Sequence, residues 1–337
     1  YILHPILTDP TGESLAQIPE LAAEGHTSLK IFLVIDDFDA RVDDYLHAMR
    51  LAARSGTLTM LHCEDGALIR CVCRELLEQG RGAPRFWPDS RPVYTEVAAT
   101  ERAIAMARSV GAPIYIVHLS SAEALASCRR ARAEGLPVYV ETRPLYLYLT
   151  REVFEEADAA KYVGAPPLRG EGDLRALWHG LWSGDIQCLC TDHAPWSLRQ
   201  KLDPTLDITT ARQGVADLET LMPMLYSEGV RTGRISLSRF VELTCTNTAK
   251  LFGMYPRKGT IAAGSDADLV IWDPEARRTI DGATMQSGAD YSVYDGRDVQ
   301  GWPVYTISRG EIVLEEGEVT ARPGRGRWVR RERTMQL

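Results

Sequence analysis

The sequence contains no long hydrophobic run and no surplus of positive charge. No apolar stretch among its 337 residues approaches the ~20 residues of a membrane-spanning helix. The net charge of −8 and the isoelectric point near 5.5 argue against nucleic acid or a membrane as a partner. A composition that is 45% hydrophobic and 25% charged is that of an ordinary globular protein.

The sequence also gives no basis for a disulfide framework. Its seven cysteines are odd in number and lie mostly within apolar segments. Two C-x-C pairs occur, Cys71 with Cys73 and Cys188 with Cys190, but no second pair completes the spacing of a zinc-binding module. We therefore expect free thiols packed inside a cytoplasmic protein.

Apolar runs alternate with helical patterns along most of the chain. The predicted strands are 1–7, 28–34, 57–62, 114–119, 137–141 and 186–191. The predicted helices are 39–54, 66–79, 94–110, 121–134, 171–182, 215–229 and 236–252. Apolar strands separated by helices indicate a parallel sheet covered on both faces, which fits a doubly wound sheet or a (β/α)8 barrel.

No glycine-rich phosphate-binding fingerprint follows the first strand, which disfavours a dinucleotide-binding sheet. Six strands are too few for a (β/α)8 barrel, so we expect an α/β fold of the TIM-barrel type that is incomplete, with its first strands missing. Beyond residue 253 the pattern changes to β alternation with glycine turns. We divide the chain into a partial barrel at 1–253, part of a small appended β-sandwich at 254–318, and an extended basic tail at 319–337.

Four ionisable residues stand on the apolar strands or directly at their ends. They are Lys30, His62, His118 and Asp192. Catalytic side chains of barrel proteins gather at the C-terminal ends of the strands, and imidazoles and carboxylates are the usual ligands of zinc. One histidine at a strand end is more often a core residue than a ligand, but four such positions together predict a metal site.

Lys30 occupies an unusual place for a charge, within the apolar run SLKIFLV. The ordinary explanation is an edge position from which the ammonium reaches water. A cation would repel a metal, whereas an uncharged lysine amine reacts with carbon dioxide to form a carbamate. Such a group could bridge two metal ions about 3.5–4 Å apart, and a hydroxide between them would be a nucleophile at neutral pH.

Many stretches of the chain resemble the cyclic amidohydrolases, in particular the dihydropyrimidinase and D-hydantoinase group. The matching stretches occur in family order and cover nearly the whole chain: SLKIF, LHCEDGALI, RPVYTEVAATERAIAMA, IYIVHLSSAEAL, YVETRPLYL, KYVGAPPLR, LWSGDI, CTDHAP, NTAKLFG and KGTIAAGSDADLVIWDP. The resemblance implies a metal-dependent hydrolase that opens the C–N bond of a small cyclic amide, such as a dihydropyrimidine or hydantoin, with a metal-activated hydroxide.

The resemblance also implies roles for the four ionisable residues. Lys30 would be the carbamylated ligand that bridges two divalent ions, with zinc the expected metal. His62 and His118 would hold the second metal. Asp192 would bind the first metal and pass a proton from the attacking hydroxide to the leaving nitrogen.

In the same resemblance, main-chain groups hold the amide of the ring. They belong to Ala165 and to the pair Gln213 and Gly214, where the family more often has serine and asparagine. Because the contacts are made by the backbone, the changed side chains need not abolish binding. The resemblance further implies a homo-oligomer, a dimer or a tetramer.

Two family features are absent from the sequence. The H-x-H motif, which supplies two metal ligands from the first barrel strand, does not occur. We expect it upstream of Tyr1, so the 337-residue chain by itself should show little or no hydrolysis. The hydantoinase tyrosine five residues after the lysine is replaced by Ile35, which cannot donate the oxyanion hydrogen bond that is worth ~2.7–4 kcal/mol.

Two other functions remain open from the sequence. An allantoinase-like or dihydroorotase-like enzyme with a carboxylate-bearing substrate would need a basic group in its pocket. Arg143 is a candidate for that group, although a surface charge is its more ordinary explanation. A non-catalytic, dihydropyrimidinase-related oligomeric scaffold is the alternative outside enzymes, but such relatives typically lack the ligands that are present here.

Overall fold

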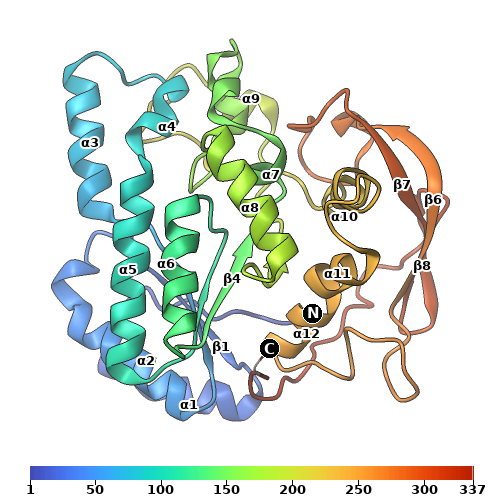
Figure 1. Cartoon of the computed structure of the whole chain (residues 1–337), viewed down its shortest axis with the longest axis horizontal. Helices are drawn as coiled ribbons and strands as arrows, with labels where there is room; N and C mark the ends of the chain where they lie inside the picture. The colour runs from blue at the N-terminus through green and yellow to red at the C-terminus, as the bar shows by residue number, and fades with distance from the viewer. Residues whose placement is uncertain (336) are drawn as a thin grey trace.

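A computed structural model, which describes residues 1–335 and 337, contains one parallel sheet (Figure 1). Its strands follow one another in chain order: β1 (Ser28–Phe32), β2 (Leu58–His62), β3 (Ile114–Ile116), β4 (Val138–Thr142) and β5 (Cys188–Leu189). All five strands predicted between residues 28 and 191 are therefore found, most of them shorter than expected. Because the strands are parallel and adjacent, their C-terminal ends meet at one edge of the sheet.

The segment at residues 1–7 is not the strand that the sequence predicts. It meets β1 in a single bridge between Ile6 and Lys30. The Leu7 N–H donates to the Lys30 carbonyl at 2.9 Å, and the Lys30 N–H donates to the Pro5 carbonyl at 2.8 Å. Pro5 has no N–H with which to extend the ladder, so the pairing stops there.

Helices cover the outer face of this sheet (Figure 1). The long ones are α1 (Gly12–Glu24), α2 (Val42–Arg54), α3 (Gly66–Glu78), α5 (Val93–Val110), α6 (Ala122–Ala133) and α8 (Glu171–Ser183). The prediction missed α1, although the Thr11 side chain accepts a hydrogen bond from the Ser14 N–H as an N-cap. Gly25, at φ 102°, ends the same helix in the left-handed conformation that favours glycine.

Shorter helices lie in the loops between these elements and, after β5, in the last part of the barrel. They are α4 (Trp87–Ser90), α7 (Leu145–Tyr148), α9 (Leu198–Lys201), α10 (Leu221–Leu225), α11 (Leu237–Val241) and α12 (Asn247–Leu251). Single π-helical segments continue α10 over Tyr226–Val230 and join α11 to α12 over Glu242–Thr246. The helix predicted at 215–229 therefore begins six residues late, because residues 215–220 form the loop that carries Asp217.

The β pattern predicted beyond residue 253 corresponds to a second sheet, which is antiparallel. It contains β6 (Leu269–Thr279), β7 (Asp298–Ser308), β8 (Glu311–Glu315) and β9 (Glu318–Val319) in chain order. The Trp272 ring on β6 lies 5.2 Å from that of Tyr226 and 6.2 Å from that of Phe240, centroid to centroid. This aromatic contact attaches the second sheet to the helices of the barrel.

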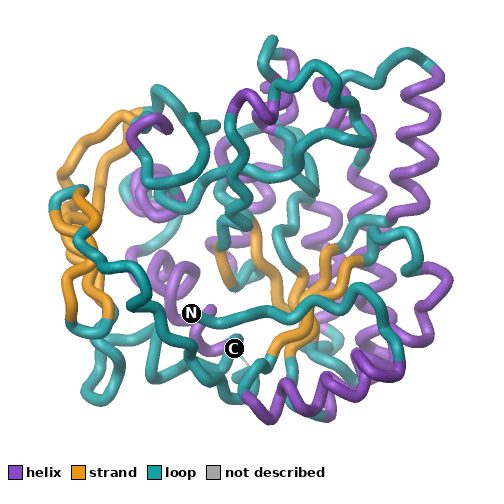
Figure 2. The backbone as a smooth tube through the Cα atoms, turned by 180° about the vertical axis from the view of Figure 1, so that it is seen from behind, coloured by secondary structure: helices purple, strands orange, loops and turns teal. Residues whose placement is uncertain are grey.

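The basic C-terminal tail lies against its own chain, and Figure 2 shows both ends on the same side of the molecule. The Val329 N–H donates to the carbonyl of Tyr1 at 2.9 Å. The Arg331 guanidinium is buried and donates to the Ser28 hydroxyl at 2.9 Å and to the Leu3 carbonyl at 2.8 Å. Among the described helices, none is long and apolar enough to cross a membrane, and the seven cysteines are free.

Candidate metal and substrate site

One cavity of about 360 Å³ opens at the C-terminal ends of the parallel strands. All seven residues that the sequence nominates line it: Lys30, His62, His118, Asp192, Ala165, Gln213 and Gly214. These residues come from six separate parts of the chain. The structure therefore brings together the predicted metal ligands and the predicted substrate-binding backbone.

His62, the last residue of β2, and His118, just beyond β3, lie side by side on the cavity wall. Nδ1 of His62 is 3.0 Å from Nε2 of His118, and both side chains are buried. Burial, with the nearby charges of His62 and Lys30, lowers the pKa of His118 well below its usual value. A neutral imidazole is the form that binds metals.

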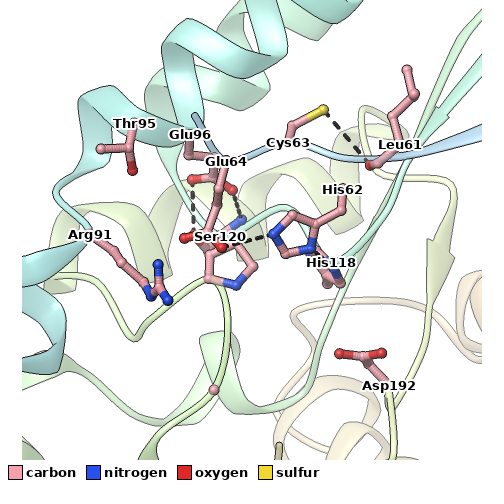
Figure 3. Close-up of polar contacts among 12 residues, drawn as sticks. Leu61, His62, Cys63, Glu64, Arg91, Thr95, Glu96, His118, Ser120 and Asp192 are labelled. Atoms are coloured by element: carbon pink, nitrogen blue, oxygen red, sulfur yellow. Dashed lines mark hydrogen bonds and ion pairs between the residues drawn. The ribbon is translucent and has the colours of Figure 1, made fainter. Parts of the chain in front are cut away.

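Backbone strain marks two of the predicted ligands. His118 has φ 38° and Asp192 has φ 49°, a region that residues other than glycine seldom adopt. Such strain persists only where the surrounding structure holds it, and it collects at functional sites. The His118 N–H donates to the Glu141 carboxylate at 3.2 Å. Two residues further on, the Ser120 N–H and hydroxyl both donate to the Glu96 carboxylate, at 2.7 and 2.9 Å (Figure 3).

Glu64 fixes the orientation of His62. Its Oε2 lies 2.8 Å from Nε2 of His62, and its side chain is buried (Figure 3). Burial raises the pKa of Glu64, but the hydrogen bond from His62 and the positive charge of Arg91 outweigh burial and lower the pKa. A carboxylate that accepts from one imidazole nitrogen leaves the other free for a metal. Sequence analysis missed Glu64, although it follows the histidine by two residues in LHCED.

The surroundings of Lys30 favour the uncharged form of its amine. Burial lowers the pKa of its ammonium to about 8, against the opposing charges of Glu141 and Asp192. Its Nζ lies 4.8 Å from the ring centroid of Phe32, and no hydrogen bond or ion pair of Nζ occurs within residues 1–335. A lysine with a lowered pKa is more often uncharged, which is the state that attacks carbon dioxide.

Arg143 is not the surface charge that the sequence favoured. Its side chain is fully buried just beyond β4, with Nη1 3.3 Å from Asp192 and Nη2 4.0 Å from Asp217. Burial and the Arg143 guanidinium act in opposite directions on Asp217; burial dominates and raises its pKa to about 7. The strand-end position alone could not reveal this, because the second carboxylate comes from a loop 74 residues away in the sequence.

The donor set fits a zinc-like metal once Lys30 is counted as a carbamate. Within the described chain, no three His, Cys, Asp or Glu side chains already form a metal-binding cluster. His62 and His118 do meet, and the buried Nδ1 of His118 has no partner among the described residues. A carbamate on Lys30 would add two oxygens to these nitrogens, a ligand set that suits a divalent ion.

The position of the expected oxyanion donor is occupied by an apolar side chain. Ile35 packs against the hydrophobic core and is not part of the cavity wall. The side chain therefore offers the substrate no hydrogen bond.

Comparison with known proteins places the chain in a family. Residues 34–313 match the Amidohydrolase family. The chain belongs to this family. The amidohydrolase is 40% identical to a D-hydantoinase of Streptomyces coelicolor, in an alignment that covers 100% of the chain and 73% of the relative. It is likewise 40% identical to a D-phenylhydantoinase of Escherichia coli, over 98% of the chain and 72% of the relative.

Comparison with solved structures leads to the same group of enzymes as comparison of sequences. The amidohydrolase superposes on a D-hydantoinase from a Bacillus species with a TM-score of 0.96 and 37% identity, over 100% of the chain and 74% of that structure. For the dihydropyrimidinase from Brevibacillus agri the TM-score is 0.95 at 35% identity, with the same coverage. The predicted TIM-type barrel with an appended β unit, and the resemblance to the hydantoinase group, are confirmed.

Proposed function

We propose that this amidohydrolase opens a hydantoin-like or dihydropyrimidine-like ring by hydrolysis of its C–N amide bond. The observation that carries the proposal is the convergence, in one cavity, of four metal-ligand candidates with the backbone segments expected to hold a cyclic amide. The names of the relatives, D-hydantoinase and dihydropyrimidinase, support the same substrate class.

The metal ligands in this proposal are His62, His118, Asp192 and Lys30 as its carbamate, with two zinc ions bound. The metals, when bound, supply a hydroxide nucleophile at neutral pH and polarise the ring carbonyl. Glu64 keeps the His62 ring in its ligand orientation. The Asp192 carboxylate, 51% exposed, is accessible from the cavity, and it moves the proton to the leaving nitrogen.

A ring that carries its own carboxylate finds less support. The buried guanidinium of Arg143 already faces the carboxylates of Asp192 and Asp217. A substrate anion would have to compete with both of them.

We further propose that the enzyme works in the cytoplasm and that it forms a homodimer or homotetramer. Light scattering on the purified protein measures the number of chains in the oligomer.

The test is ring opening by the product of the complete gene, supplied with zinc and bicarbonate. Hydantoin, dihydrouracil, allantoin and dihydroorotate are compared at equal concentration. We expect hydantoin or dihydrouracil to be opened fastest and the activity to disappear with a chelator and in Asp192→Asn. The control Asp203→Asn, at a residue that does not line the cavity, should keep the activity. Opening of none of the rings, or of dihydroorotate alone, would contradict the proposal.

A further inference from the structure

Lys201, the last residue of α9, is a buried lysine that no step of the proposed reaction uses. Burial lowers its pKa to about 7, whereas hydrogen bonds to carbonyl acceptors favour its charged ammonium form. Its side chain is only 1% exposed. Its Nζ donates to three carbonyl oxygens: Val163 at 2.7 Å, Arg212 at 2.7 Å and Gly214 at 2.9 Å. Three hydrogen bonds use the whole donor capacity of an ammonium. Burying a charge is costly unless its hydrogen bonds are satisfied, as they are here.

The three carbonyls belong to the two backbone segments that border the substrate cavity. Val163 lies two residues before Ala165 in the first segment. Arg212 and Gly214 flank Gln213 in the second. The Gly214 N–H also donates to the Val163 carbonyl, at 3.1 Å. The ammonium therefore ties together two pieces of chain that are about fifty residues apart in sequence.

The second segment is closely fitted on its other side. Gly214 has φ 122°, and a Cβ at this position would lie 2.5 Å from Cβ and 2.7 Å from the carbonyl oxygen of Ala194. The Trp196 indole N–H donates to the Gln213 carbonyl at 2.8 Å. The backbone at Gln213 is thus held from the side of Ala194 and Trp196 and from the side of Lys201. Between this segment and that of Ala165 lie the Gly214 N–H bond to Val163 and the ammonium of Lys201.

We propose that Lys201 is a positioning residue that sets the spacing between the 163–165 and 212–214 segments, and so shapes the binding site for the ring amide. The nature of the ring rests on the proposed function, whereas the spacing does not. Without the ammonium, three inward-facing carbonyl oxygens would lose their shared donor, and the segments would separate. In this proposal the two segments hold the amide both in the bound substrate and in the transition state. Their displacement therefore raises KM more than it lowers kcat.

A matched control exists in Arg239 of α11, which also holds two backbone carbonyls. Its Nε donates to the Leu181 carbonyl at 2.8 Å, and its Nη2 donates to the Ile186 carbonyl at 2.6 Å. Arg239 does not line the substrate cavity. Arg239→Met therefore removes a carbonyl-bound cation without touching the two segments.

Hydrogen exchange followed by mass spectrometry tests the spacing on the 337-residue chain. We expect Lys201→Met to accelerate exchange in peptides that contain 163–165 and in those that contain 212–214, and Arg239→Met to accelerate it only around 181–186. Faster exchange in just one of the two segments, or in neither, would overturn the proposal. Lys201→Arg, which keeps the charge but has a different donor geometry, provides the same test where Lys201→Met does not fold.

Kinetics of the complete gene product adds a readout that a purely structural residue would not move. We expect Lys201→Met to raise the KM for the ring substrate about tenfold or more, the scale of one hydrogen bond to a charged group, with kcat changed much less. Arg239→Met should leave KM unchanged. If the unmodified enzyme opens no ring, the proposed function fails, while hydrogen exchange still decides the role of Lys201.

Discussion

The guanidinium of Arg143 lies 3.3 Å from the carboxylate of Asp192, and this contact joins the end of β4 to the end of β5 inside the cavity. The arginine is fully buried, whereas half of the Asp192 side chain is exposed. On its other side Arg143 faces Asp217, which is as completely buried as the arginine. The proton-transfer residue of the proposed reaction is therefore held by a cation that is itself anchored in the core.

Removal of one member of this buried pair should be far more costly than removal of both. At about pH 9, above the pKa of about 7 that Asp217 has beside Arg143, Arg143→Met leaves the Asp217 carboxylate buried without a cation, and we expect the free energy of unfolding to fall by about 3–5 kcal/mol. The double variant Arg143→Met with Asp217→Leu should recover most of that loss, because no uncompensated charge remains. Urea denaturation measures both. A loss below about 1 kcal/mol in the single variant, or no recovery in the double variant, contradicts the pairing.

The raised pKa of Asp217 predicts a specific pH dependence of stability. Its carboxyl has a pKa of about 7 in the folded protein, up from 3.8, so the folded state holds a proton that the unfolded state releases between these values. The contribution of this group to stability is full below about pH 4 and is lost as the pH rises to about 7. The difference in unfolding free energy between the unmodified protein and Asp217→Asn should change over that window. A difference that stays constant from pH 4 to 7 would exclude the shift.

Glu64 should control the affinity of the site for metal without binding metal itself. Glu64→Gln keeps the shape of the side chain but replaces a charged acceptor of the His62 hydrogen bond with a neutral one. We expect zinc affinity, measured by calorimetry, to fall about 10–100-fold. The exposed Glu75 lies on α3 away from the cavity, so Glu75→Gln serves as the control. Equal affinities for the two variants would show that the orientation of His62 does not depend on Glu64.

The sequence was sufficient to predict the parts of the structure that depend on local pattern. The apolar runs around Lys30, His62 and His118 are strands or strand ends, and the parallel order places their ends around one cavity. That geometry follows from strand connectivity alone, so the site could be assembled before any contact was known. The helix at 12–24 was missed although Leu15, Ile18 and Leu21 have helical spacing, because it contains Pro19, a residue that usually breaks a helix.

Contacts between distant parts of the chain could not be predicted. Nothing near Arg143 in the sequence indicates that Asp217 will face it, and nothing near Lys201 indicates that three carbonyls will converge on its ammonium. Both cations look like ordinary surface charges in the sequence, because charged residues are almost always exposed. Their burial is decided by loops that meet only in the folded barrel. Glu64 differs from these two, because its partner His62 is only two residues away and the contact depends on the rotamers of both side chains.

Lys30 carries the central prediction, that it is a carbamate which holds metal together with His62 and His118. The most direct measurement is carbon NMR of the complete gene product loaded with zinc in 13C-bicarbonate, combined with metal analysis. We predict a carbamate carbon resonance and about two zinc ions per chain, both lost in Lys30→Met. Full zinc occupancy with no carbamate signal, or unchanged zinc content in Lys30→Met, would contradict the assignment.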